Sequence, residues 1–264
     1  MQRDFLSVVK RDGRTVWSLA LNDFKRRHAG SHFGVAWAFV QPVITILVFW
    51  FVFEFGLRTQ TVQGVPFLVW LVCGLVPWFY FAEGLSGASN SLIEYNYLVK
   101  KIVFKVELLP LIKLIAASFV HFVFVGLLFV LIASFSVPAN LAMLQIAYYF
   151  IATTALVIAF SLVTVSIVPF FKDLSQIIVI CLQFGMWLTP IMWDDSYLPQ
   201  RFRWILFANP VTYLVQGYRD AILHGRWFWE KPEQSLYFWC FVLVLFAFGF
   251  ALFRRLRPHF ADVL

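Results

Sequence analysis

Long apolar runs, separated by short polar or charged stretches, set the pattern of the chain. Four runs of about 20 residues lie at 35–57, 66–85, 174–193 and 236–253. A helix of this length can cross the hydrocarbon core of a bilayer. Between the second and the third, residues 114–171 contain no Asp, Glu, Lys or Arg, which is long enough for two crossings. The segment SFSVPAN at 134–140 carries turn-forming residues that would separate these two. The pattern predicts an all-α membrane protein with six transmembrane helices.

The composition supports this class and leaves no stretch for a soluble domain. Hydrophobic residues make up 61% of the 264 positions and charged residues only 13%, whereas soluble domains carry about 25% charged residues. The first 34 residues are basic and lack a long apolar run, so they do not resemble a secretory signal. We expect a cytoplasmic amphipathic interface helix at 1–34 and a single transmembrane domain at 35–264. The cysteines Cys73, Cys181 and Cys240 all fall inside apolar runs, without metal or disulfide spacing.

Basic residues are distributed unevenly between the two sides of the predicted spans. Fifteen would lie on one side: Arg3, Lys10, Arg11, Arg14, Lys25, Arg26, Arg27, Lys100, Lys101, Lys105, Lys113, Lys172, Arg254, Arg255 and Arg257. Six would lie on the other: Arg58, Arg201, Arg203, Arg219, Arg226 and Lys231. Because Lys and Arg accumulate in cytoplasmic loops, we expect both termini in the cytoplasm. The net charge of +7 is then a signal of topology and of lipid headgroups, and no nucleic-acid partner is expected.

Residues 4–27 have the pattern of an interfacial amphipathic helix. The apolar residues that can share one face are Val9, Val16, Trp17, Ala20, Leu21 and Phe24. Gly13 is expected to break the helix into two pieces. Such a helix could be a basic anchor that only orients the protein, or a cytoplasmic cuff that receives an anionic lipid headgroup.

The connection between the second and third spans, SLIEYNYLVKKIVFK at 91–105, contains a possible helix start. Ser91 and Glu94 have the spacing of a capping box, which satisfies free amides at the beginning of a helix. A short helix here could dock a cytoplasmic partner or be an ordinary interfacial turn. The spacing alone favours the turn.

The segment 196–225 is apolar but broken by proline. Its apolar runs, 204–207 and 211–215, are too short to cross the membrane. Pro210 disfavours helix at Asn209 and can begin a new one. Two short helices meeting there would dip into the outer leaflet and return, which requires a cavity enclosed by the protein. The alternative is an amphipathic loop lying flat on the membrane, and the physical argument favours the re-entrant pair.

Neither catalytic nor metal-binding chemistry is apparent. The chain lacks a G-x-x-x-x-G-K-[ST] phosphate loop, and His121 is expected to be a packed, hydrogen-bonded residue rather than a ligand. Glu54 and Glu83 are single acids within spans, with no evident partner. The adjacent acids Asp194-Asp195 at the end of a span suggest a solvated boundary. We therefore expect a protein that is not an enzyme and that carries no cofactor or metal of its own.

Five stretches follow one another in the chain: DFKRRHAGSHFGVAWAFVQPVITILVF, GVPFLVWLVCGLVPWFYFAEGLSGASNSLIEYNYLVKKIVF, FFKDLSQIIVICLQFGMWLTPIMW, NPVTYLVQGYRDAILHG and FRRLRPHFADVL. Together they resemble the permease subunits of ABC exporters for lipid-linked polysaccharides, the Wzm-type O-antigen permeases and the related teichoic acid permeases of the ABC-2 family. The chain departs from the family pattern at Asn22-Asp23-Phe24, Phe104-Lys105 and Lys172-Asp173.

The resemblance implies a homodimer in the bacterial cytoplasmic (inner) membrane, with a pore at the dimer interface. It implies two copies of a separate ABC ATPase subunit, which hold ATP and Mg. The expected substrate is a polysaccharide carried on undecaprenyl pyrophosphate, such as an O-antigen, or a teichoic acid. Residues 91–105 become the coupling helix that contacts the ATPase, and 196–225 the outer gate.

Candidate residues for each role follow from this resemblance and from side-chain chemistry. Arginine and lysine in the basic arm suit the lipid pyrophosphate: Arg14, Lys25, Arg26 and Arg27. The residues expected to couple to the ATPase are Glu94, Tyr97, Leu98, Lys100 and Lys101, and those of the gate are Asn209, Pro210, Tyr213 and Arg219. Aromatic rings can hold the apolar faces of sugars weakly at many sites, which makes candidates of Trp37, Phe39, Phe49, Trp50, Phe53, Phe184 and Trp187.

Two other function classes remain open at this point. One is a membrane-embedded enzyme acting on polyprenyl-linked sugars, which would want paired acids at a membrane face. The other is a plain channel. Aromatic rings could also simply face lipid, since Trp is common at membrane interfaces. A neighbouring gene for an ATPase with a phosphate loop would favour the exporter.

Overall fold

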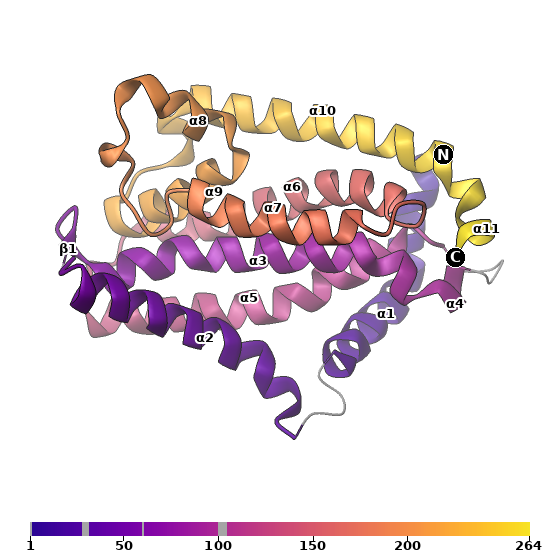
Figure 1. The fold of residues 1–264 in the computed structure, drawn as a ribbon, viewed down its shortest axis with the longest axis horizontal. Coiled ribbons are helices and arrows are strands. Elements are labelled where there is room, and N and C mark those ends of the chain that lie inside the picture. Colours follow the sequence, from indigo (N-terminus) through magenta and orange to yellow (C-terminus); the bar gives the residue numbers. More distant parts are fainter. Residues whose placement is uncertain (1, 28–31, 60, 100–104) are drawn as a thin grey trace.

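The computed structural model describes residues 2–27, 32–59, 61–99 and 105–264, and most of them are helical. The helices that run along the long axis are α2 (Trp37–Trp50), α3 (Phe67–Glu94), α5 (Leu108–Ser134), α6 (Ile146–Ile167), α7 (Leu174–Leu188) and α10 (Pro232–Leu256) (Figure 1). Among the described residues, five spans are long and apolar enough to cross a membrane, and α7 is a shorter apolar helix. Both chain termini lie at the same end of the bundle (Figure 1). The all-α membrane architecture predicted from the apolar runs is confirmed.

The fifth predicted span is shorter than the apolar run suggests. The run extends over 174–193, but α7 has only 15 residues and ends at Leu188. Thr189 is extended, with φ −82° and ψ 135°, because the proline at 190 disfavours helical backbone at the residue before it. Of the apolar residues that remain in the run, Ile191 and Met192 are buried in the connection that follows.

Helix α3 forms the centre of the bundle. It packs against α5, α6, α7 and α9, and Phe67, Leu71 and Leu75 along it are fully buried. Helices α2 and α7 lie on the outside, and each has only one buried residue, Ile46 and Ile178 respectively. The turn predicted at 134–140 is confirmed, since α5 ends at Ser134 and a 3₁₀ turn, η3 (Leu141–Gln145), precedes α6.

Helix α1 (Gln2–Arg26) lies across one end of the bundle and packs on α5 (Figure 1). The predicted break at Gly13 is wrong, because α1 is one continuous helix. A single glycine costs a helix only about 1 kcal/mol relative to alanine, and helix extends on both sides of it. The predicted apolar face is only partly right: Val16 and Ala20 are buried, but Trp17 is 57% exposed.

The connection after α3 also differs from the prediction. Ser91 and Glu94 belong to the last turn of α3 and do not cap a new helix. The Ser91 hydroxyl donates to the carbonyl of Ala88 at 2.7 Å, one turn back in the same helix. A four-residue helix, α4 (Asn96–Val99), follows. Of the expected coupling segment 91–105, residues 100–104, including Lys100 and Lys101, lie outside the described residues.

We call the end with α1, α4 and α11 (Phe260–Val263) the α1 end, and the opposite end the α8 end. The α8 end holds the hairpin of β1 (Thr61–Val62) and β2 (Val65–Pro66) and the helices α8 (Arg203–Ala208) and α9 (Pro210–Arg219). The hairpin loop is Gln63-Gly64, both with positive φ, as a two-residue type I′ loop requires. The helix pair predicted to meet at Asn209-Pro210 is present: Asn209 is the N-cap of α9, and its side chain accepts a hydrogen bond from Val211 N.

Candidate functional sites at the two ends of the bundle

A buried ion cluster joins α1 to α3 and α5 at the α1 end. Asp23 on α1 is 4% exposed. One of its carboxylate oxygens accepts hydrogen bonds from Lys113 Nζ of α5 and from the hydroxyl of Tyr95, each at 2.6 Å. The other oxygen lies 3.2 Å from Arg27 Nε. Because a buried carboxylate must be paired and hydrogen-bonded to be tolerated, Asp23 fixes the position of α1 on the bundle.

The same cluster includes two acids of α3. Arg27 Nη1 donates to Glu83 Oε1 at 2.6 Å, and Lys113, which is 1% exposed, also pairs with Glu94. Glu83 therefore has a partner, contrary to the expectation from sequence. A Cβ at Gly87 would lie 3.0 Å from Arg27 Nη2, so glycine leaves room for the guanidinium.

The charges of this cluster shift the ionisation of its members outside the spans. Burial alone would raise the pKa of Asp23, but the hydrogen bonds from Lys113 and Tyr95 and the charges of Lys113 and Arg27 outweigh it. The pKa of Asp23 is therefore below its ordinary value of 3.8. The pKa of Tyr95 is raised, first by burial and then by its hydrogen bond to the negative Asp23. Asp23 thus stays ionised and Tyr95 stays protonated at neutral pH.

A pocket of about 390 Å³, the basic pocket, adjoins this cluster. Its lining residues are Leu19, Asn22, Lys25, Arg26, Tyr95 and Tyr97. Lys25 and Arg26 are exposed, and the lining that the structure describes contains cations and phenol groups but no carboxylate. Such a set of donors suits an anion. The pocket brings two of the four predicted pyrophosphate ligands next to Tyr97, one of the predicted coupling residues.

The other predicted ligands and coupling residues lie elsewhere. Arg27 turns to Asp23 and Glu83 and is not part of the basic pocket. Nothing is described of the Arg14 side chain. Leu98 is half-buried and packs against the hydrophobic cluster of the α1 end.

The predicted aromatic stripe of α2 faces the rest of the protein. Phe39, Phe49, Trp50 and Phe53 are half-buried and pack against the main hydrophobic core. Phe49 meets Trp187 of α7 edge-on, with ring centroids 6.2 Å apart, so the stripe connects α2 with α7.

Three of the predicted rings keep large exposed areas. Trp37 is 41%, Phe184 65% and Trp187 54% exposed. They are the rings of the predicted set that remain free to contact another molecule, whether polymer, lipid or a second subunit.

Helix α9 at the α8 end is almost entirely buried, which excludes a loop lying flat on a surface. Tyr213 is 9% exposed. Its hydroxyl lies 2.9 Å from that of Tyr148 and 3.0 Å from that of Ser235. Asn209 donates from Nδ2 to the Thr189 hydroxyl at 2.9 Å. By contrast, Phe207 on α8 is 58% exposed, so α9 is the fixed member of the pair and α8 the outer one.

Arg219 is buried rather than at the outer surface, where the charge count placed it. It is 2% exposed, and its guanidinium carbon lies 3.4 Å from the ring centroid of Trp70. It donates to the carbonyls of Trp70, Pro190 and Ile191. No carboxylate among the described residues forms an ion pair with it. Its bonds tie the end of α9 to α3 and to the chain after α7.

The acidic pair after α7 is only partly a solvated boundary. Asp194 is 6% exposed and accepts hydrogen bonds from Gln63 Nε2 at 2.7 Å and from Ser196 N at 2.8 Å. Burial alone would raise the pKa of Asp194, but these hydrogen bonds outweigh it and bring the pKa below its ordinary value of 3.8. The pKa of its neighbour Asp195 is raised, first by partial burial of the carboxyl group and then by the charge of Asp194. Asp194 therefore ties the hairpin to the α7–α8 connection.

Two single residues in the spans, His121 and Glu54, have partners within the protein. His121 is a packed residue, as predicted: its Nε2 lies 3.1 Å from the Tyr218 hydroxyl, and its ring stacks on Phe150 at 5.3 Å. Glu54 accepts a hydrogen bond from the indole of Trp50, one turn before it. The expectation that Glu54 lacks a partner is wrong.

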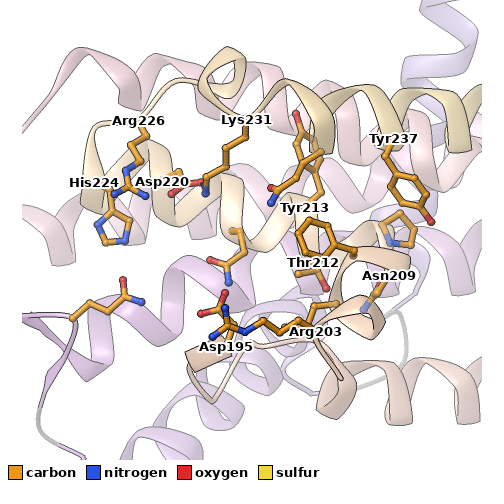
Figure 2. A pocket seen from close by; sticks show the side chains of 16 residues that line it. Asp195, Arg203, Asn209, Thr212, Tyr213, Asp220, His224, Arg226, Lys231 and Tyr237 are labelled. Carbon is orange, nitrogen blue, oxygen red and sulfur yellow. Dashed lines mark hydrogen bonds and ion pairs between the residues drawn. The ribbon is translucent and has the colours of Figure 1, made fainter. Parts of the chain in front are cut away.

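A cavity of about 320 Å³ opens beside α8 and α9 (Figure 2). It agrees with the cavity that the broken segment predicts at this end. Asn209, Pro210 and Tyr213 of the predicted gate line it, while Arg219 does not. We call it the α8 pocket.

Sequence reasoning missed the two central members of the ion cluster, Asp23 and Lys113. Asp23 and Arg27 are four residues apart, the spacing of a helix ion pair, which could have indicated the first contact. Lys113 stands alone in the first turns of a very apolar helix, and an isolated charge in such a place signals a buried partner. No local signal indicates which acid that partner is.

Comparisons with known proteins agree with this architecture. The model of the family described as ABC-2 type transporter matches residues 14–223. An "O-antigen export system permease protein RfbA" of Klebsiella pneumoniae is 26% identical over 249 residues, which cover 92% of each chain. A protein of the same name from Myxococcus xanthus is 24% identical, covering 93% of each. The "Polysialic acid transport protein KpsM" of Escherichia coli is 23% identical over 91% of this chain and 92% of its own.

Proposed function

The chain belongs to the ABC-2 type transporter family, and from this premise we propose that it is the transmembrane subunit of an ATP-driven polysaccharide exporter. The relatives that it matches over nearly their whole length are permeases for O-antigen and a transport protein for polysialic acid. It is a transporter subunit and not an enzyme. ATP and Mg belong to a separate ATPase subunit, and the substrate is a polysaccharide on a lipid pyrophosphate carrier such as undecaprenyl pyrophosphate.

The basic pocket at the α1 end is the main structural support for this function. Lys25 and Arg26 stand there beside Tyr97, which is 46% exposed at the connection after α3. An anion bound by these cations would touch both α1 and the segment to which the ATPase docks. Lipid pyrophosphate offers the oxygens that such cations bind in charge-assisted hydrogen bonds. Binding of the substrate's pyrophosphate would thus take place next to the contact with the ATPase, where it can affect ATP hydrolysis.

The orientation follows from the distribution of charge. The α1 end holds the basic arm and the basic tail, and we place it in the cytoplasm because Lys and Arg favour that side. The α8 end then faces outward, in the bacterial cytoplasmic (inner) membrane.

The assembly we propose is a homodimer with two ATPase subunits. Helices α2 and α7 support it, because among the six long helices they have the fewest buried residues and they expose apolar rings such as Phe184 and Trp187. A pore between two such faces would be lined by aromatic rings, which hold sugar faces weakly enough for a polymer to slide.

We also propose that the α8–α9 pair gates the exit, with α8 moving against the buried α9. In a background with Cys73, Cys181 and Cys240 replaced by serine, a cysteine at Asn209 should react with a membrane-impermeant thiol reagent only when ATP is hydrolysed. Labelling at the same rate without ATP would contradict this movement.

The central test reverses the charge of the basic pocket. In the complex with its ATPase, Lys25→Glu with Arg26→Glu should abolish polymer export and the stimulation of ATP hydrolysis by lipid-linked substrate. Arg254→Glu with Arg255→Glu is the matched control, because it removes two exposed cations from the same end outside the pocket. The topology of both variants is measured by cysteine accessibility. Normal export by a correctly inserted pocket variant would refute the proposed site.

A further inference from the structure

The α8 pocket has the size and the lining of a site for a small polar ligand. Its volume of about 320 Å³ is at the lower end of the roughly 300–1,000 Å³ that small-molecule sites occupy. It therefore suits a single sugar ring better than a chain segment. Its walls come from separate parts of the chain: the hairpin loop, α8, α9 and the start of α10 (Figure 2).

A buried hydroxyl in this pocket lacks a partner. Thr212 of α9 lines the cavity, is 9% exposed, and its Oγ1 makes no hydrogen bond to any residue that the structure describes. Leaving such a group unpaired is costly, and nearly all buried polar groups in proteins are bonded. The oxygen itself is covered, and rotation of the side chain about χ1 would bring it to a hydroxyl group of a ligand in the pocket.

Two cations of the pocket also lack ion-pair partners. Lys231 pairs with Asp220, but Arg203 and Arg226 form no ion pair within the described part of the chain. Arg203 extends from α8 toward Asp195 along the pocket wall (Figure 2). Guanidinium groups match carboxylates and phosphates in geometry and charge. Two acids, Asp195 and Asp220, also line the pocket, but the three cations Arg203, Arg226 and Lys231 outnumber them. The surplus of positive charge can attract an anionic substituent.

Aromatic rings complete the lining. Phe207 and Tyr237 both border the pocket and are 58% and 44% exposed. An exposed ring gives an apolar surface on which the C–H face of a sugar can rest, while hydroxyls and charges around it fix the orientation. Apolar faces, a free hydroxyl and free cations are together the complement of an acidic sugar.

We propose that the α8 pocket binds one sugar unit of the exported polymer on the exit side, a unit bearing a carboxylate or phosphate group. Thr212 bonds a ring hydroxyl, and Arg203 and Arg226 supply positive charge for the anionic group. The inference rests on the proposed export function and names a substrate contact away from the basic pocket. A weak exit site of this kind would hold the emerging polymer against backsliding.

The experiment places the photo-crosslinking amino acid benzoylphenylalanine at Tyr237 in cells that export their native polymer through the complete transporter. Irradiation should yield an adduct that stains for glycan after periodate oxidation. The matched control is the same amino acid at Val244, on the same helix, 71% exposed and outside the pocket. Gln234 is a second pocket position, used if the Tyr237 variant does not export.

Substitutions then test the chemistry. Arg203→Gln with Arg226→Gln should lower the adduct yield about tenfold, the scale of a lost hydrogen bond to a charged group. Thr212→Val should lower it several-fold at unchanged protein level. Arg201→Gln should change nothing, because Arg201 is a cation of the same segment that packs on Phe202 and does not line the pocket.

The outcomes separate the two proposals. Equal glycan adducts at Tyr237 and Val244, a phospholipid adduct, or no glycan adduct while polymer reaches the cell surface would overturn the pocket site and leave the export function standing. A glycan adduct insensitive to the two arginine substitutions would overturn the anionic part. If cells with the unmodified chain and its ATPase export no polymer at all, the proposed function itself fails.

Discussion

Removing the charge of Asp23 is expected to release α1 from the bundle. The carboxylate is 4% exposed and holds Lys113, Tyr95 and Arg27 at 2.6, 2.6 and 3.2 Å. Asp23→Ala would leave Lys113, itself 1% exposed, with only the half-exposed Glu94 as partner. Breaking a buried ion pair by removing one partner typically costs about 3–5 kcal/mol. A loss of that size corresponds to a lower melting temperature on the order of 10 °C.

The measurement is thermal unfolding of the purified protein in detergent, combined with limited proteolysis of α1. Lys113→Met is the partner variant, since methionine keeps much of the side-chain volume without charge. The double variant should be more stable than the sum of the two single losses predicts, by about 2 kcal/mol, because it leaves no unpaired charge between these positions.

The effect should depend on pH in a definite direction. The pKa of Asp23 is lowered in the folded protein, so its contribution is fully present above the unfolded pKa, near 4. It disappears as the pH falls through the lower, folded pKa. The stability difference between wild type and Asp23→Asn should therefore be constant from pH 5 to pH 8 and shrink only below about pH 4.

Three results would contradict this reasoning. The first is a melting temperature of Asp23→Ala within 2 °C of the wild type. The second is additivity of the two single losses without coupling. The third is a stability difference between wild type and Asp23→Asn that vanishes already at pH 6. Each would mean that α1 is held by its apolar contacts and not by the ion cluster.

Three further predictions test other parts of the molecule. Tyr97→Glu should prevent co-purification with the ATPase while membrane insertion persists. The neighbouring Asn96→Glu, outside the basic pocket, should leave co-purification intact, and equal loss in both variants would indicate general disruption of α4. Phe184→Leu with Trp187→Leu should keep the fold and the basal ATPase activity but reduce polymer export at least several-fold, and full export would place these rings against lipid. Arg219→Met should lower the melting temperature on the order of 10 °C by deleting the bonds to three carbonyls, and a melting point equal to that of the wild type would show that this buried cation does not anchor α9.

The spans and the broken segment follow from local sequence. A window of apolar residues either is long enough to cross a bilayer or is not, and so the positions of the helices at 67–94, 108–134 and 232–256 could be foreseen, although the first continues nine residues beyond the end of its apolar run at 85. The break at Asn209-Pro210 is equally local, since proline restricts the residue before it and cannot donate from its own nitrogen. Even the early end of α7 before Pro190 follows this rule, although the apolar run obscured it.

The roles of individual charges could not be foreseen in this way. Arg26 and Arg27 are neighbours with identical side chains, yet Arg26 lines an open pocket while Arg27 pairs with Glu83, which lies 56 positions further along. Arg219 counts as an ordinary outer charge until α3 places Trp70 beneath its guanidinium. Backbone rules act between neighbouring residues and hydropathy acts over one continuous run of about 20 residues, so the sequence by itself determined which segments become helices and where they break. The partner of a charge depends on which distant segments the folded bundle brings within a few ångströms, and only the tertiary structure decided that.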